Sequence, residues 1–313
     1  MSETEKIIYG GHETISKAIT SNLLSPKALS EFFRISLSGG CTAKGIGMRN
    51  RGFGDINLTG EIPPGSTIEK AFLYWAVMFN PDQPEDTTGK INDNLITGTL
   101  IASPQGPCWN PPEINVYRAD VTSFVNNNIN SLTEFPSGVT NSTPPQDDQT
   151  PPLLEGASLV VIFRNPVLPT RTIIINDGGE TITGFQTVST SFNNIQPIAS
   201  PVEAKTIYIV ADGQFRFLND TALFNNQPVA GPGTLIKTAD AFDGADGRAI
   251  PGYDFDGIWD TLTIDVSNKI NNDDTDATAS ISDISDCLTY IAQVLCINSP
   301  SPTRGIDFKN FIK

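Results

Sequence analysis

Histidine is almost absent from this chain of 313 residues, in which His12 is the only one. A Ser-His-Asp or Cys-His nucleophile would have to be built on that residue, and a zinc ion would find one imidazole at most. Charged residues are also scarce, at 18% of the chain. Acidic residues are still plentiful enough for a glycosidase, but no spacing singles out a pair of them. The sequence therefore predicts a protein that is not an enzyme.

Long apolar runs and clusters of basic residues are missing as well. No stretch approaches the roughly 18 consecutive apolar residues of a membrane-spanning helix. The 20 Lys and Arg residues are dispersed and outnumbered by 35 Asp and Glu, so no basic stripe is available to contact a phosphate backbone. We expect no transmembrane segment and no nucleic-acid partner. Residues 1–33 also lack the apolar segment of a signal peptide, since Leu23 and Leu24 form only a pair.

The cysteines have no CxxC spacing, which argues against a zinc site or a thioredoxin-like site. The four are Cys41, Cys108, Cys287 and Cys296. Two disulfides and four free thiols both remain open, because the compartment of the protein decides between them and the residues do not identify that compartment.

Glycine and proline are abundant by contrast, with 26 and 23 residues scattered along a chain in which long amphipathic helical patterns are rare. Many short strands joined by turns fit this composition best. The densest hydrophobic run, at residues 68–79, reads IEKAFLYWAVMF. A short helix competes with a strand in so brief a run, but the flanking Pro63-Pro64-Gly65 and Asn80-Pro81 and the aromatic side chains favour a strand. We predict a central strand buried on both faces.

The second half of the chain repeats the plan of the first. Residues 205–212, KTIYIVAD, take the place of the central strand, and residues 287–297, CLTYIAQVLCI, take that of residues 155–166, EGASLVVIFRNP. The closest match joins DVTSFVNNN, which begins at Asp120, and DVSNKINND, which begins at Asp265. In each copy we expect the Asp carboxylate or the Thr or Ser hydroxyl to cap a helical turn, which is a structural role.

This pattern predicts an all-β fold of two tandem β-sandwich lobes, jelly-roll-like and carrying short helical turns. The first lobe is expected at residues 35–198 and the second at residues 199–313. Residues 1–34 have a different sequence pattern from the rest, with apolar residues at loose helical spacing before Pro26. We predict that they form a peripheral N-terminal arm.

Several of these segments carry a family resemblance. The series GFGDINLTGEIPPGSTIEKAFLYW, YRADVTSFV, EGASLVVIFRNP, RTIIINDGG and DCLTYIAQVL is similar to a group of poorly characterised bacterial and archaeal cell-surface β-sandwich proteins, over about residues 40 to 300. Members often occur with adhesin-like repeats and have no established activity, so the resemblance implies a surface or structural location and no chemistry. The chain departs from the group in lacking a recognisable signal sequence, which puts ordinary export in doubt. The D-V-T turn is also similar, at the level of fold, to one in carbohydrate-binding jelly-roll modules.

An acidic loop at residues 240–260 is the best candidate binding site. Aspartates occur there at every third position from residue 240 to residue 246 and again between residues 254 and 260. A flexible loop that brings several carboxylates together suits calcium, which takes six to eight oxygen ligands. The pattern is not that of an EF-hand, and a solvated acidic loop is the simpler reading. The residues predicted to hold the ion are Asp240, Asp243, Asp246, Asp254 and Asp256.

Aromatic residues supply a candidate sugar platform. Trp109 lies in the turn GPCWNPP, and Tyr253 and Phe255 lie in the acidic loop. For each of the three, an anchor of the core or of a loop is the simpler reading.

These observations favour a non-enzymatic surface or assembly protein with a structural, adhesive, appendage or spore-surface role. We expect it at the cell or spore surface or outside the cell, although no signal peptide is recognisable. Its expected partners are further copies of itself, in a homo-oligomer or surface assembly, or other surface proteins or glycans. Two alternatives stay open: a calcium-dependent carbohydrate-binding module, and an inclusion or pore-forming toxin-like protein.

Overall fold

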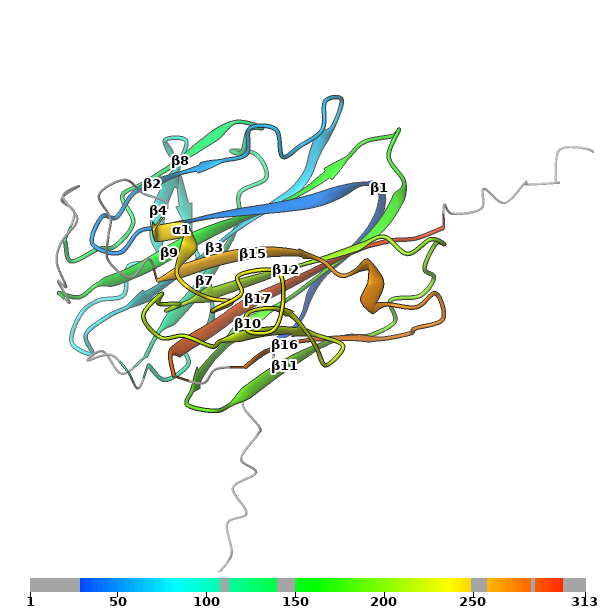
Figure 1. Ribbon diagram of the computed structural model, residues 1–313. Coiled ribbons are helices and arrows are strands. Elements are labelled where there is room, and N and C mark those ends of the chain that lie inside the picture. Colours follow the sequence, from blue (N-terminus) through cyan, green and yellow to red (C-terminus); the bar gives the residue numbers. More distant parts are fainter. Residues whose placement is uncertain are drawn as a thin grey trace, which may run out of the picture.

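The computed structural model describes residues 29–106, 108, 113–139, 150–248, 258–282 and 285–300. Strands dominate these residues, and Figure 1 shows them stacked as layers of sheet. The described helices are α1, Ala245–Arg248, and a 3-10 turn at Ser267–Lys269. No helix in this part of the chain therefore has the length and apolarity that crossing a membrane requires.

The first group of strands forms a sandwich of two sheets. The first large sheet has the order β1-β9-β3-β7-β6, and the first small sheet has the order β2-β8-β4-β5. The strands are β1 (Ser30–Gly47), β2 (Gly54–Asn57), β3 (Thr67–Met78), β4 (Thr88–Ile91), β5 (Asn94–Thr97), β6 (Thr99–Ala102), β7 (Asn115–Asp120), β8 (Ile129–Thr133) and β9 (Leu153–Arg164).

The second group forms another sandwich. The second large sheet has the order β10-β17-β12-β15, and the second small sheet has the order β11-β16-β13-β14. The strands are β10 (Thr170–Thr183), β11 (Thr187–Phe192), β12 (Ala204–Ala211), β13 (Thr221–Phe224), β14 (Gln227–Ala230), β15 (Trp259–Asp265), β16 (Ala277–Ser282) and β17 (Cys287–Asn298).

Both groups have the strand order of a jelly roll. With β6 left aside and the strands of each group counted along the chain, the large sheets read 1-8-3-6 and the small sheets read 2-7-4-5. Eight antiparallel strands in two such sheets define the jelly-roll architecture. The predicted fold class, all-β with two jelly-roll-like sandwiches in tandem, is confirmed.

The D-V-(T/S) segments make the same contacts in the two jelly rolls. Asp120 Oδ1 accepts a hydrogen bond from the NH of Thr122 at 3.0 Å, and Thr122 Oγ1 accepts one from the NH of Ala71 at 3.0 Å. Asp265 and Ser267 repeat both contacts, at 2.8 Å and, with the NH of Ala204, 2.9 Å. These side chains do have a structural role, because they satisfy backbone groups where the strand leaves the sheet. The predicted cap of a helical turn is not what they form: the 3-10 turn at Ser267–Lys269 has Val266 as its N-cap and no side-chain cap hydrogen bond, and the segment after Asp120 is a turn.

Strand β1 belongs to both large sheets and joins them into one sheet of nine strands. Its residues 30–38 pair with β10, and its residues 39–47 pair with β9. The change of partner falls at Gly39, whose φ is +153°. A Cβ atom at this position would lie 2.0 Å from the carbonyl oxygen of Phe163, so only glycine allows the two strands to approach here.

Three hydrophobic cores separate the four sheets. Trp75 fills the core between the first large and small sheets, where it stacks on Tyr117 with the ring centroids 5.6 Å apart. Tyr208 lies in the corresponding core of the second jelly roll. The middle core lies between the two large sheets and contains Tyr74 and Ile207, among others. Both large sheets are therefore buried on both faces, which confirms the predicted central strand as β3 and explains why its sequence does not alternate.

The sheet pairing crosses the predicted lobe boundary at residues 198 and 199. Strands β10 and β11 precede that boundary, yet they pair with β17 and β16, which follow it. The chain passes from one jelly roll to the other between β9 and β10. Residues 1–28 of the predicted arm lie outside the described residues, and residues 30–34 form the start of β1. The division into separate domains stays a prediction.

We expect Gly39→Ala to lower the free energy of unfolding by about 3–5 kcal/mol, because it adds a clash with Phe163 to the backbone strain. Gly60→Ala is the matched control, since Gly60 has a φ of +82° but no neighbouring atom within 4 Å of an added Cβ. It should cost only about 1–2 kcal/mol. Urea denaturation of both variants measures the difference, and equal losses would contradict the role given to Gly39.

Candidate functional site

Charged side chains from both jelly rolls are wholly or partly buried together at one end of the molecule. At this end β1 finishes at Gly47, opposite Gly156 of β9, and β12 finishes at Ala211, opposite Thr289 of β17. We call the group the loop-end cluster. Its members are Arg49, Glu155, Asp212, Lys237, Asp240, Asp243, Asp246 and Asp260.

Lys237 compensates two of these carboxylates. Its Nζ lies 2.9 Å from Asp260 Oδ1 and also contacts Asp243 Oδ1. Asp260 is 1% exposed and accepts hydrogen bonds from the NH groups of Gly244 at 2.8 Å and Ala245 at 3.1 Å. Burial acts to lower the pKa of Lys237, but the carboxylates of Asp260 and Asp243 outweigh it and raise that pKa. The lysine ammonium thus supplies the positive charge that a cation would otherwise supply.

Asp240 and Asp246 each keep one buried carboxylate oxygen, Oδ2, that has no hydrogen-bond partner. The other oxygen of Asp240, Oδ1, accepts a hydrogen bond from the NH of Asp220 at 3.0 Å. Asp246 lies against β1, where its Oδ2 would be 2.2 Å from a Cβ atom added to Gly45. Burial raises the pKa of each carboxyl group to about 7. Two carboxyl groups that exchange a proton near neutral pH therefore lie in this cluster.

Arg49 connects the two jelly rolls through charge. It follows β1, contacts Glu155 in β9 and lies 3.9 Å from Asp212, which follows β12. All three residues are buried, and burial raises the pKa of Glu155 although the guanidinium group lies beside it. Removing one partner from such a network leaves an uncompensated buried charge, so the network is part of the fold as well as of the cluster.

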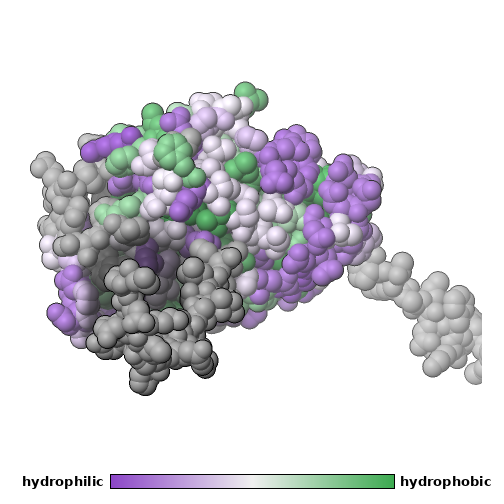
Figure 2. Space-filling view, turned by 90° about the horizontal axis from the view of Figure 1, so that it is seen from below, coloured by the Kyte–Doolittle hydropathy of each residue, from purple (hydrophilic) through white to green (hydrophobic). Residues whose placement is uncertain are grey.

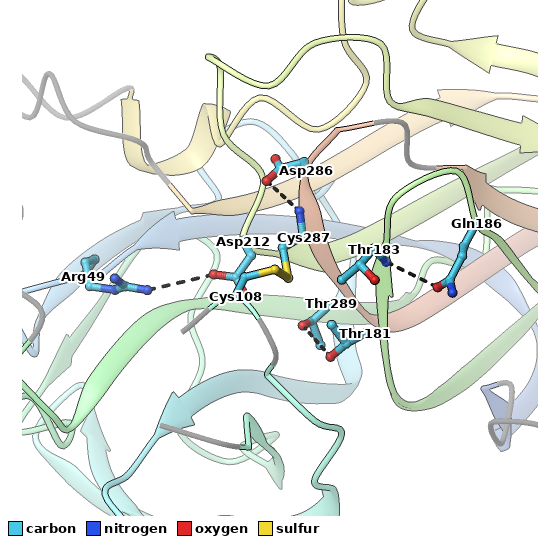
Figure 3. The surroundings of a disulfide bond; sticks show 9 residues. All are labelled: Arg49, Cys108, Thr181, Thr183, Gln186, Asp212, Asp286, Cys287 and Thr289. Atoms are coloured by element: carbon cyan, nitrogen blue, oxygen red, sulfur yellow. Dashed lines mark hydrogen bonds and ion pairs between the residues drawn. A yellow bond between two sulfur atoms is a disulfide. The ribbon is translucent and has the colours of Figure 1, made fainter. Parts of the chain in front are cut away.

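A disulfide bond lies in the same region. Cys108 precedes β7 in the first jelly roll, and it is bonded to Cys287, the first residue of β17 in the second. Figure 3 shows this bond beside the Arg49–Asp212 pair, with Asp286 next to Cys287 in the chain. The question that the cysteine spacing left open is answered in part, because Cys41 and Cys296 are free and buried.

The chemistry of the loop-end cluster is that of proton exchange and charge compensation within a buried acidic environment. Carboxyl groups with a pKa near 7 are suited to general acid–base work, but such work also requires a substrate position within hydrogen-bond reach. Burial equally raises the pKa of carboxyl groups that serve only the fold. The cluster is therefore a candidate site that is marked by buried carboxyl groups with raised pKa values.

A second candidate site is a cleft of about 580 Å³ between the two large sheets, at the end opposite the loop-end cluster. On one side it is lined by β1 and Phe163, and on the other by β12, β15 and β17. Charged side chains of both signs surround it, and the two free cysteines line it as well. The residues that the cleft contacts include Cys41, Cys296, Glu61, Arg171, Glu203, Lys205 and Asp265.

Residues 42–298 match the model of a family described as Protein of unknown function (DUF3344). The chain belongs to this family. The match runs from β1 to the last residue of β17 and so takes in both jelly rolls, the loop-end cluster and all but one of the residues named above for the cleft, Cys41. No curated protein matches the chain in sequence.

Solved structures similar to this DUF3344 chain are remote from it. BuGH86 in complex with neoagarooctaose is 10% identical and has a TM-score of 0.26, over 85% of this chain and 34% of its own. BpGH86A, a β-porphyranase of glycoside hydrolase family 86 from the human gut bacterium Bacteroides plebeius, is 10% identical with a TM-score of 0.27, over 87% and 36%. The major capsid protein P2 from bacteriophage PM2 is 12% identical with a TM-score of 0.23, over 84% and 100%. The chain spans about a third of the length of the two glycoside hydrolase family 86 proteins. TM-scores this low do not show that this chain shares the fold or the function of any of the three.

Three of the aspartates predicted to hold calcium in the DUF3344 chain, Asp240, Asp243 and Asp246, are among the described residues. Among the described residues, no three acidic, cysteine or histidine side chains are grouped closely enough for a metal ion. Asp243 is paired with Lys237, while Asp240 contacts the backbone of Asp220. Asp254 and Asp256 lie outside the described residues, and so do the predicted sugar-platform residues Trp109, Tyr253 and Phe255. Calcium and sugar binding stay predictions.

Sequence reasoning missed Lys237, Arg49 and the buried acids at strand ends. Glu155 opens the hydrophobic segment EGASLVVIF and Asp212 closes KTIYIVAD, so each stands next to a run that is certain to be buried. A charged residue directly beside such a run is a usable signal of a buried ion pair. The sequence does not indicate which residue is the partner, because Arg49 is 106 residues from Glu155 in the chain.

We predict that Asp246→Asn removes part of the pH dependence of stability in this DUF3344 protein. The folded state holds the Asp246 proton up to about pH 7, whereas the unfolded chain releases it near pH 4. The contribution of Asp246 to the free energy of unfolding therefore falls as the pH rises between these two values. The variant should match the wild type at pH 4 and exceed it by about 1–3 kcal/mol at pH 8. Chemical denaturation at both pH values measures this, and the same difference at both would contradict it.

Arg49→Met should lower the free energy of unfolding by about 3–5 kcal/mol, because it leaves Glu155 buried without its cation. Lys70→Met is the matched control, since Lys70 forms an exposed ion pair with Asp120 at 2.8 Å. That substitution should cost less than about 1 kcal/mol. Thermal and urea denaturation of the two variants would compare them. Similar small losses would show that the Arg49 network contributes nothing specific.

Proposed function

We propose that this DUF3344 protein is a non-enzymatic structural or assembly protein of a cell surface or of the extracellular space. The observation that carries the proposal is the disulfide between Cys108 and Cys287. Structural disulfides form and persist in oxidising environments and are rare in reducing ones. This bond joins the two jelly rolls across 179 residues of sequence, so it closes a large loop of the chain and stabilises their arrangement.

The internal bracing of the molecule supports a mechanical role. Three features hold the jelly rolls together: the shared strand β1, the middle core between the large sheets, and the buried contacts of Arg49 with Glu155 and Asp212. Interiors packed on every face resist deformation. A unit of this kind is suited to transmit force or to hold a fixed spacing within a surface layer or appendage.

The surface supports association through polar contacts. The chain has a formal net charge of −15, and Figure 2 shows hydrophilic residues at their densest towards the right-hand end of the face seen from below. Other copies of the chain, or other surface proteins and glycans, are the partners that we propose. Acidic surfaces repel one another at low ionic strength, so assembly of identical copies should strengthen as salt screens the charge.

Surface labelling of intact cells that produce the protein tests the proposal. A membrane-impermeant amine reagent should label it before lysis, and a non-reducing peptide map should contain the Cys108–Cys287 link. Sedimentation of the purified protein from low to physiological salt should then reveal assemblies larger than the monomer. Free thiols at Cys108 and Cys287 in the native protein, together with labelling only after lysis, would refute the proposed location. Monomers at every salt and protein concentration would refute self-assembly.

A further inference from the structure

The two free cysteines come from different large sheets and meet between them. Cys41 lies in the part of β1 that pairs with β9, and Cys296 lies near the end of β17. They are 1% and 2% exposed, and their thiols are hydrogen-bonded to each other. Both line the cleft between the large sheets, so a small molecule in the cleft contacts them. The pair is therefore almost fully covered by protein and lies in the wall of the cleft.

The surroundings of the two thiols differ in charge. Lys205 of β12 stands directly opposite Cys296 in the antiparallel pairing, and Arg171 of β10 lines the same cleft. The hydrogen bond from the Cys41 thiol, together with the charges of Lys205 and Arg171, outweighs burial and lowers the pKa of Cys296. The same hydrogen bond and burial raise the pKa of Cys41. Of the two thiols, Cys296 is therefore the one that ionises more readily.

Acidic groups also face the cleft. Glu203 forms an ion pair with Arg171 at 3.1 Å, and Glu61 forms one with Lys44 at 2.8 Å. Asp265 stands opposite Lys205 on β15. Charges of both signs therefore border the opening, so a small, neutral disulfide is the class of molecule that enters without a charge penalty.

We propose that Cys41 and Cys296 are a redox-active thiol pair, which a small disulfide bound in the cleft oxidises to a second disulfide between the two jelly rolls. The Cys296 thiolate attacks one sulfur of the small disulfide, forms a mixed disulfide and releases one thiolate. The Cys41 thiol gives up its proton to that departing thiolate. Cys41 then attacks Cys296 Sγ in the mixed disulfide, and the second small thiolate leaves and takes a proton from water. Two protein thiols are oxidised, and one small disulfide is reduced to two thiols.

This bond would brace β17 at both of its ends. Cys287 already connects the start of the strand to the first jelly roll, and Cys296 lies nine positions further along. Oxidation would connect that end of β17 to β1, at the floor of the cleft. The cleft would then be closed at its base by a covalent bond, and reduction would restore the hydrogen-bonded thiols.

Purified full-length protein treated with hydroxyethyl disulfide tests the inference independently of its location in the cell. Under native conditions the count of free thiols should fall from two to zero, and a non-reducing peptide map should contain a Cys41–Cys296 link. Protein that already carries this link after purification supports the inference equally. In Cys41→Ser the reaction should stop at one mixed disulfide on Cys296. In Cys296→Ser the remaining Cys41 should react about tenfold more slowly, because it lacks thiolate character.

Lys205→Gln separates a reactive pair from two cysteines that are merely close. At pH 6 the substitution should make the reaction about threefold slower than in the wild type. A Cys296 pKa one unit higher lowers the fraction of thiolate about tenfold, and the greater nucleophilicity of that more basic thiolate restores part of the rate. Lys90→Gln, in the first small sheet, is the control and should leave the rate unchanged. Thiols that react only after denaturant is added, or links from Cys41 or Cys296 to Cys108 or Cys287, would overturn the inference. So would equal rates for Lys205→Gln and the control.

Discussion

The shared strand β1 is the constraint on which the rest of the structure depends. One strand of eighteen residues supplies the first strand of one jelly roll and the outermost partner of β10 in the other. The two large sheets are consequently continuous and must face each other, since the chain bends where it changes partner at Gly39. Both faces of both large sheets are then buried, one against a small sheet and the other in the middle core between the jelly rolls.

Burial on both faces moves the polar chemistry to the ends of the sheets. A strand interior packed on two sides has no place for an unpaired charge, because desolvation disfavours the charged form. The loop-end cluster lies at one end of the strands and the charged groups around the cleft lie at the other, while the buried charge of Asp177 inside β10 is paired with Arg118 of β7. Arg49 and Lys237 hold their positions by contacting acids from other segments, so each end of the molecule is a junction of several loops and strands.

The cysteines follow the same division. Cys108 and Cys287 lie at the loop end and are bonded, whereas Cys41 and Cys296 lie in the middle core beside the cleft and are not. Strand β17 carries one cysteine of each pair, so it is the element through which covalent bracing at one end and thiol chemistry at the other are connected.

The sequence by itself determined the fold class and the central strands, because a run such as IEKAFLYWAVMF can be covered only from both sides. It also determined the role of the D-V-(T/S) segments, since a short polar side chain next to a strand end contacts its own backbone. Tertiary structure alone decided which strand is shared and which acids lie together. These depend on pairings between residues more than one hundred positions apart, such as Arg49 with Glu155 and Cys108 with Cys287. The local sequence pattern does not indicate such pairings, because the energy that stabilises them comes from burial and charge compensation, which exist only once the sheets have packed together.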